Sequence, residues 1–187
     1  MKFQEVGQHL IVRYHKGQAK LRFKGTGVSV RKVLLDVAKG KTFKGIVAAH
    51  PKLTWESVAE AVQLAAEALV EPYAAHHTAV SALRRAGRGE EVRLLKPWPI
   101  GKHLEIHPNV CFGRLTFDGT RLPVETMLTY LAMRGTIEYI LNGWPYLKRE
   151  ALVEAIRLAA AALEERYTAQ DEAVHEPALS RRVSSTK

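Results

Sequence analysis

The sequence predicts a mainly α protein with short β-hairpins, of the α+β class, in which one small unit occurs twice and the two copies pack as a pseudo-dimer. The main observation is that the chain aligns with itself without a gap at an offset of 94 positions, with about 27 identities over roughly 74 residues. Apolar residues also recur at helical spacing in the later part of each copy, after short alternating segments. We therefore predict that each copy consists of a β-ribbon and three helices that resemble a helix-turn-helix.

The repeat divides the chain into four segments. Residues 1–80 hold a strongly basic first copy, residues 81–98 a charged linker, residues 99–174 the second copy and residues 175–187 a polar tail. Units of this size bury little core by themselves, so we expect the two copies to pack against each other or the chain to form a homo-oligomer. The aligned positions themselves run from Gly7 to Val80 and from Gly101 to Val174.

Each copy opens with a predicted β-hairpin. In the second copy, residues 103–106 alternate like a strand, residues 107–109 have turn chemistry and residues 114–117 form a second short strand. Residues 10–13 and 20–23 are the equivalent strands of the first copy. Two short strands per copy are therefore expected before the helices.

Three helices should follow in each copy. The first has apolar residues at helical spacing, with Pro123 suited to its first turn in the second copy. A glycine ends this helix, a threonine begins a short second helix, and that helix must stop before a proline. The third helix is the longest and carries an apolar stripe, with Thr54 as its N-cap in the first copy. The delimiting residues are Gly40, Thr42 and Pro51 in the first copy and Gly135, Thr136 and Pro145 in the second.

Composition restricts the class of protein. The chain is 47% hydrophobic and 25% charged, which is typical of a globular protein. Residues 1–24 lack the apolar core of a secretory signal, and no run of about 18 apolar residues predicts a membrane span. We therefore expect a cytoplasmic protein with no membrane contact. The single cysteine, Cys111, excludes an internal disulfide and a cysteine-based metal cage.

The second copy resembles the bacterial family called domain of unknown function 433. The resemblance covers Leu104 to about Leu163 and rests on three steps that occur in order: Gly-Thr-Arg-x-Pro-Val, a helix start at Thr136, and Pro-x-Leu. The first copy is a diverged example, with Gly27 in place of the arginine and Ser29 in place of the proline. The residues that match the family motif are Gly119, Thr120, Arg121, Pro123, Pro145 and Leu147.

The resemblance implies a trihelical, helix-turn-helix-like fold and a bacterial or archaeal origin. Members of the family are commonly regarded as antitoxin-like partners of PIN-type toxin ribonucleases and are suspected of binding DNA. The family has no agreed catalytic residues to carry over. Its Gly-Thr-Arg step is expected to be structural.

Positive charge is concentrated in the first third of the chain. Residues 1–52 contain twelve Lys or Arg against two acids, and the rest of the chain nearly cancels, so this segment accounts for the whole formal charge of +9. Such a surface attracts phosphate backbones through counterion release, and we predict nucleic-acid contact, with DNA favoured over RNA. The alternative is a solvated basic face without a partner. The predicted contact residues are Arg13, Lys16, Lys20, Arg22, Lys24, Arg31, Lys32, Lys39, Lys41 and Lys44.

Glutamates at the start of the third helix argue against ordinary helix-turn-helix readout. A recognition helix offers Arg, Lys, Asn or Gln to base edges, whereas carboxylates repel phosphate. Either these glutamates are surface residues that favour helix N-termini, or they bind basic residues of the other copy or of a partner protein. The four predicted partner-binding residues are Glu56, Glu60, Glu150 and Glu154.

Residues that could support catalysis are sparse. Residues 39–42 resemble the end of a phosphate-binding loop, but Leu35 stands where that motif requires its leading glycine. His76 and His77 are adjacent rather than one helical turn apart, and the acidic residues are dispersed. We therefore expect no enzymatic activity, no cofactor and no metal site.

The family resemblance implies an antitoxin-like regulator of a toxin–antitoxin module, and the charge distribution adds a predicted nucleic-acid contact. It would bind nucleic acid through the basic first copy and a protein partner, such as a PIN-type toxin ribonuclease, through the second. The alternative is a protein-interaction module with no nucleic-acid role.

Overall fold

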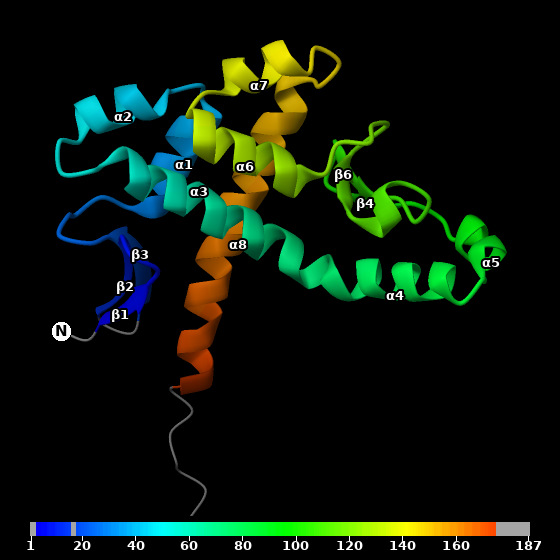
Figure 1. The fold of residues 1–187 in the computed structure, drawn as a ribbon. Helices are drawn as coiled ribbons and strands as arrows, with labels where there is room; N and C mark the ends of the chain where they lie inside the picture. The colour runs from blue at the N-terminus through cyan, green and yellow to red at the C-terminus, as the bar shows by residue number, and fades with distance from the viewer. Residues whose placement is uncertain (1–2, 16–17, 175–187) are drawn as a thin grey trace, which may run out of the picture.

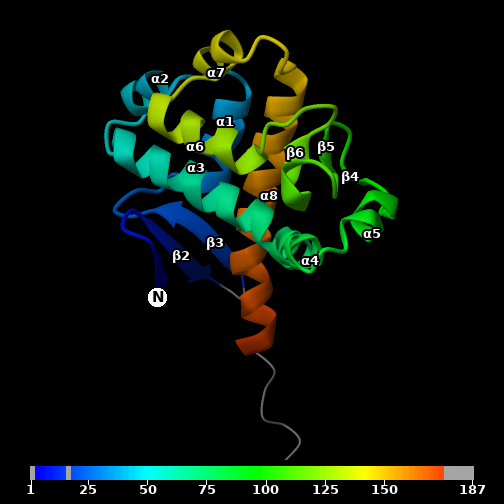
Figure 2. The same ribbon diagram turned by 45° about the vertical axis from the view of Figure 1, so that its right-hand side comes forward.

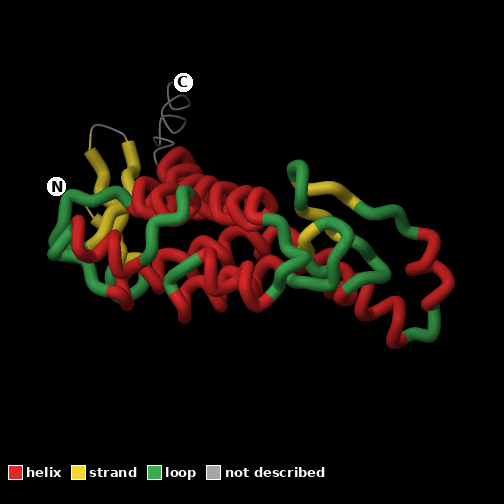
Figure 3. Tube along the Cα trace, turned by 90° about the horizontal axis from the view of Figure 1, so that it is seen from above, coloured by secondary structure: helices red, strands yellow, loops and turns green. Residues whose placement is uncertain are grey.

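The computed structural model describes residues 3–15 and 18–174. The predicted polar tail at residues 175–187 and the predicted contact residue Lys16 lie outside the described part of the chain. The fold is a layer of helices with one small antiparallel sheet at each of two opposite sides (Figures 1 and 3), which confirms the predicted α+β class and the repeated unit. Within the described residues, no helix is both long enough and apolar enough to cross a membrane.

The elements follow the same order in both copies, with two extra helices between them. The first copy contains β1 (Phe3–Val6), β2 (Leu10–His15), β3 (Gln18–Phe23), α1 (Val30–Ala38), α2 (Phe43–Ala49) and α3 (Trp55–Val70). The connection contains the 3-10 turn η1 (Glu71–Tyr73), α4 (Ala74–Arg85) and α5 (Gly89–Leu94). The second copy contains β4 (Trp98–Ile100), β5 (Leu104–Ile106), the 3-10 turn η2 (Cys111–Gly113), β6 (Leu115–Phe117), α6 (Val124–Arg134), α7 (Ile137–Gly143) and α8 (Arg149–Val174).

The sheets have three strands each in the described residues, where the sequence predicts hairpins of two. The predicted pairs correspond to β2–β3 and β5–β6, and the additional strands β1 and β4 pair with β2 and β5 at the sheet edges. Alternation does not mark these edge strands, because Val6 is the only buried residue of β1 and β4 contains Pro99. The repeated structure therefore begins a few residues before Gly7 and Gly101.

The helix ends confirm most of the predicted caps. The hydroxyls of Thr42 and Thr136 accept hydrogen bonds from the third residue of α2 and α7, and Thr54 forms a capping box with Ser57 at the start of α3. The prediction that Pro123 lies in the first turn of α6 is wrong by one residue. Pro123 is the N-cap, with an extended backbone at ψ 134°, because its carbonyl accepts from Met127 while its ring precedes the helix.

The third helices of the two copies differ in length. α8 continues to Val174, whereas α3 ends at Val70, where Pro72 stands in place of the equivalent Arg166. Proline lacks a backbone N–H and its ring crowds the preceding turn, so the chain changes direction through η1 into α4 (Figures 1 and 2). The predicted charged linker at residues 81–98 is largely helical, because it contains the end of α4 and all of α5.

The two copies pack as the predicted pseudo-dimer. α3 packs on α8 at the centre, α3 also packs on α6, and α1 packs on α8 (Figure 2). Exchanging the copies converts the α3–α6 contact into the α8–α1 contact, so the interface is approximately two-fold symmetric. Each third helix packs more extensively on the first helix of the other copy than on its own, and buried residues of both copies form one hydrophobic core. Neither copy therefore has a complete core alone.

Candidate nucleic-acid interface

The outer face of the first sheet brings three of the predicted basic residues together. Leu21 and Phe23 of β3 point into the core, so Lys20 and Arg22 lie on the opposite face. Arg13 of β2 is directly opposite Lys20 in the β2–β3 register, and Phe3 of β1 is opposite Arg13. Like charges at paired positions repel, and an anion across this face would reduce the repulsion. Glu5 lies on the same face, and Arg22 donates to the carbonyl of Gly27. We call Arg13, Lys20 and Arg22 the sheet cations.

Phe3 is the residue of this face that sequence reasoning did not identify. Its side chain is 64% exposed at the edge of the sheet, in the same row as Arg13 and Lys20. An exposed aromatic ring beside cations can stack on an unpaired base, as single-strand binding proteins do. Phe3 reaches this face because the additional strand β1 pairs with β2.

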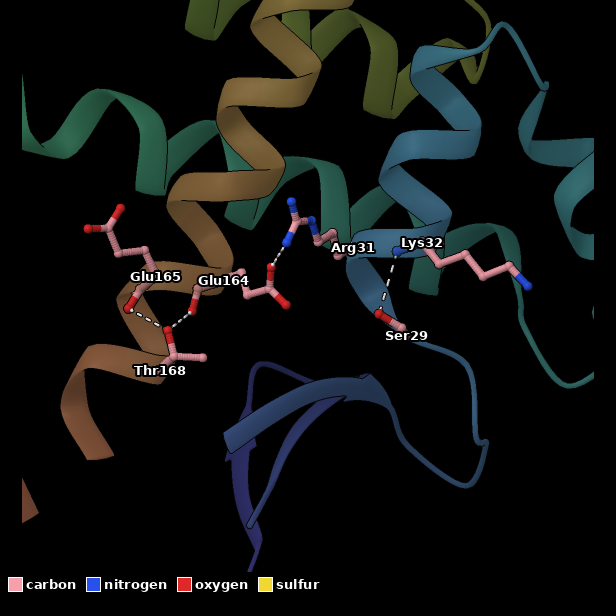
Figure 4. Close-up of polar contacts among 6 residues, drawn as sticks. All are labelled: Ser29, Arg31, Lys32, Glu164, Glu165 and Thr168. Carbon is pink, nitrogen blue, oxygen red and sulfur yellow. Dashed lines mark hydrogen bonds and ion pairs between the residues drawn. The ribbon is translucent and has the colours of Figure 1, made fainter. Parts of the chain in front are cut away.

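The basic residues at the start of α1 are not on one side of the helix. Ser29 caps the helix, and Arg31 and Lys32 then extend away from each other (Figure 4). The Nη1 atom of Arg31 donates to Glu164 of α8 at 2.6 Å, so this cation is neutralised by the other copy (Figure 4). Lys32 forms no ion pair within the described residues.

Two further predicted cations surround a shielded carboxylate at the end of α1. Asp36 is buried, and Lys41 and Lys39 lie 3.1 Å and 3.8 Å from its carboxylate oxygens. Lys24 lies 3.2 Å from Glu5 on β1. Together with Arg31, these residues have acidic partners inside the chain. Among the predicted contact residues in the described ranges, Arg13, Lys20, Arg22, Lys32 and Lys44 do not.

The third helix is not available to enter a DNA groove. Most of one side of α3 is buried, including Val58, Ala61 and Leu69, because α6, α8 and α2 pack on it. The exposed first turn presents Glu56, whose pKa lies below its ordinary value because its carboxylate accepts hydrogen bonds from its own backbone N–H and from Thr54. This agrees with the alternative in which the glutamates favour helix N-termini.

Glu60 and Glu154 hold the sheets onto the third helices. The carboxylate of Glu60 accepts from the backbone N–H groups of Gln8 and His9 at 2.6 Å and 2.7 Å, in the turn between β1 and β2. Glu154 accepts from Lys102 and His103 at 2.8 Å and 2.7 Å in the equivalent turn. Both carboxylates thus bind the backbone of their own copy instead of the basic side chains of the other. A role of Glu56 and Glu150 in partner binding stays a prediction.

The residues that match the family motif build the turn from the sheet into the next helix. Gly119 has φ 68°, and the hydroxyl of Thr120 donates to the carbonyl of Phe117 at 2.8 Å and accepts from the N–H of Leu122 at 3.1 Å. Thr26 makes the equivalent bonds in the first copy, at 3.0 Å and 3.1 Å. Leu147 is buried in the core, and Pro145 follows α7. Arg121 is exposed.

Exposed apolar side chains are concentrated outside the basic copy. Phe112 is 59% exposed, and both it and Cys111 have positive φ angles, at 57° and 46°, which are uncommon for residues other than glycine. Trp98 is 54% exposed at the edge of the second sheet. The large apolar residues exposed after residue 90 are Leu94, Leu95, Trp98, Phe112, Met133, Tyr139 and Tyr146.

The histidines do not assemble a metal site. Within residues 3–15 and 18–174, no group of three His, Cys, Asp or Glu residues could hold an ion. His77 instead donates from Nδ1 to the carbonyl of Phe112 at 2.8 Å. The thiol of Cys111 donates to the carbonyl of Arg121 at 3.3 Å. Both groups therefore take part in holding the loop around η2.

Comparison with known proteins identifies the repeated unit. The model of a family described as "Protein of unknown function (DUF433)" matches residues 16–65 and 104–159, which is more than half of the chain. The two matched segments confirm that both copies, including the diverged first one, are examples of the same unit. No curated protein and no solved structure matches the chain.

Proposed function

The chain belongs to the DUF433 family, whose function is unknown. From the family resemblance and from the chain's own surface, we propose that it is an antitoxin-like regulator that binds nucleic acid through the first copy and a protein through the second. The observation that carries the proposal is the row of sheet cations. Arg13 and Lys20 face each other without a carboxylate partner in the described residues, and Arg22 lies on the same face. A phosphate backbone across this face would relieve their repulsion.

The first copy contacts the phosphate backbone of the nucleic acid rather than the base edges of a duplex. α3 is packed between other helices and begins with glutamate, so it cannot serve as a recognition helix. Phosphate contacts position a protein on DNA and carry no sequence information by themselves. We therefore expect weak sequence preference and strong salt dependence.

The protein partner contacts the second copy. Exposed Trp98 and Phe112 lie there, away from the sheet cations, and large exposed aromatic residues are enriched in protein interfaces. The family resemblance suggests a PIN-type toxin ribonuclease for this role. The same residues support the second candidate function, a protein-interaction module without nucleic acid.

Salt titration of DNA binding separates the two functions. We expect duplex DNA to bind with an affinity that falls steeply with salt, and replacement of the three sheet cations by glutamine to reduce the slope of log K against log salt by about 2 to 3, since each lost phosphate contact removes about 0.9. The matched control replaces Arg85, Arg93 and Lys96, which removes the same charge from the connection between the copies.

Two results contradict the nucleic-acid proposal. One is the absence of binding at low salt. The other is an equal loss of slope in the control variant, since the net charge alone would then account for binding. Either result leaves the protein-interaction module as the proposed function.

A further inference from the structure

A pocket lies where the end of the α3 helix meets the second sheet. Its cavity volume is about 150 Å³, and its apolar lining comes from Val70, Tyr73, Leu115 and Pro123. Ala74, His77, Arg114 and Glu125 complete the lining. A cavity of this size holds one benzene-sized group.

The duplication explains why the pocket is open. At the equivalent place in the other half, α8 continues straight along β3, and its Glu164 forms the 2.6 Å ion pair with Arg31 of α1 (Figure 4). Position 70 is valine where α8 has Glu164, and position 125 is glutamate where α1 has Arg31. Pro72 also interrupts the helix beside the pocket, so the chain continues through η1 into α4. The two copies of this place therefore differ, because one contains the Arg31–Glu164 ion pair and the other lacks it.

A cation and an anion line the same pocket. Arg114 on the sheet side and Glu125 in the first turn of α6 are both exposed, and neither forms an ion pair with any described residue. They do not pair with each other either, although both line the same cavity. A ligand that carries both charges beside an apolar group would satisfy them together.

We propose that this pocket binds a free amino acid with a large apolar side chain, such as leucine or phenylalanine. The side chain enters the apolar part between Val70, Tyr73 and Leu115. The carboxylate binds the Arg114 guanidinium, which offers several donors in one plane. The ammonium group binds the Glu125 carboxylate. The inference does not depend on the proposed nucleic-acid contact, which lies on the other sheet.

Analogues of phenylalanine that lack one charged group test each contact separately. Titration of the full chain with phenylalanine, followed by calorimetry and by amide NMR shifts, should give millimolar or tighter binding with shifts at residues 74 and 115. 3-Phenylpropanoate lacks the ammonium group and phenethylamine lacks the carboxylate, and both should bind about tenfold more weakly or worse. Glu125→Gln should weaken phenylalanine binding to a similar extent but leave 3-phenylpropanoate binding unchanged.

A variant whose new side chain fills the pocket can be compared with a control variant at the next residue. Ala74→Phe places a ring in the cavity and should abolish binding, whereas Ala75→Phe changes an exposed neighbour outside the cavity and should not. Thermal unfolding of both variants verifies that they are folded. Equal binding of all three ligands, retained binding in Ala74→Phe, or no binding of phenylalanine or leucine at millimolar concentration would overturn the proposal. In the last case the pocket would be a candidate anchor for a protein side chain instead.

Discussion

The contact between Gly7 and Glu60 allows a quantitative test of how the sheet is attached to the helices. Gly7 has φ 66°, and an added Cβ would collide with the carboxylate of Glu60 that caps the turn. Gly25 has the same φ of 66° with no atom within 4 Å of an added Cβ, so it serves as the matched control. Gly25→Ala should therefore cost only the left-handed backbone penalty, about 1–2 kcal/mol.

Gly7→Ala should cost more, about 3–4 kcal/mol, because it also displaces a carboxylate that accepts two backbone N–H bonds. Glu60→Ala should cost about 2 kcal/mol by itself, since one of those bonds is exposed and screened. In the Glu60→Ala background, Gly7→Ala should fall back to the cost of Gly25→Ala. The double-mutant cycle should thus give a coupling of about 2 kcal/mol.

Urea unfolding followed by circular dichroism measures these free energies, with the m-value as a test that unfolding remains two-state. The second copy provides an independent repetition, because an added Cβ at Gly101 would lie 2.6 Å from Oε1 of Glu154. Equal costs for Gly7→Ala and Gly25→Ala, or a coupling near zero, would refute the reasoning that the carboxylate fixes this turn.

Three further perturbations test other parts of the structure. Gly135→Ala should destabilise by about 2–4 kcal/mol in thermal or urea unfolding, since φ is 71° and the added Cβ would strike the Trp55 ring of the other copy; a cost below about 1 kcal/mol would contradict that contact. Arg31→Ala should cost less than about 1 kcal/mol, because its ion pair with Glu164 is 54% and 36% exposed, and a larger loss would mean that the pair is structural. The pKa of Glu56 should lie below the ordinary range in an NMR titration, so its stabilising effect is complete above the unfolded-state pKa and is lost as the pH falls through the folded-state pKa; an ordinary midpoint would remove the hydrogen bonds assigned to it.

Much of each copy follows from local sequence. The threonine caps and the glycine turns were predictable because a cap or a left-handed turn depends on residues a few positions apart. The same is true of the apolar stripe of the third helix. The edge strands β1 and β4 were not predictable, since a short edge strand with few buried residues shows no alternation.

The candidate sites were likewise only partly predictable from the sequence. Composition located the positive charge in the first copy, but it could not indicate that Arg31 meets Glu164, which is 133 positions away, or that Asp36 neutralises two nearby lysines. Ion pairs form between side chains that folding brings together, so only the structure identifies the cations that lack a partner. The sheet cations and Phe3 emerged in this way.

Local sequence was enough to show that one unit occurs twice, which threonines cap its helices, and which sides of those helices are apolar. The tertiary structure decided what those sides bury: each third helix packs on the first helix of the other copy. An apolar stripe specifies that a face leaves water but not which partner covers it, because the hydrophobic effect has no direction. Pro72 interrupts the third helix in one copy only, so the two halves differ where that helix meets the sheet: one contains the Arg31–Glu164 ion pair and the other contains the pocket.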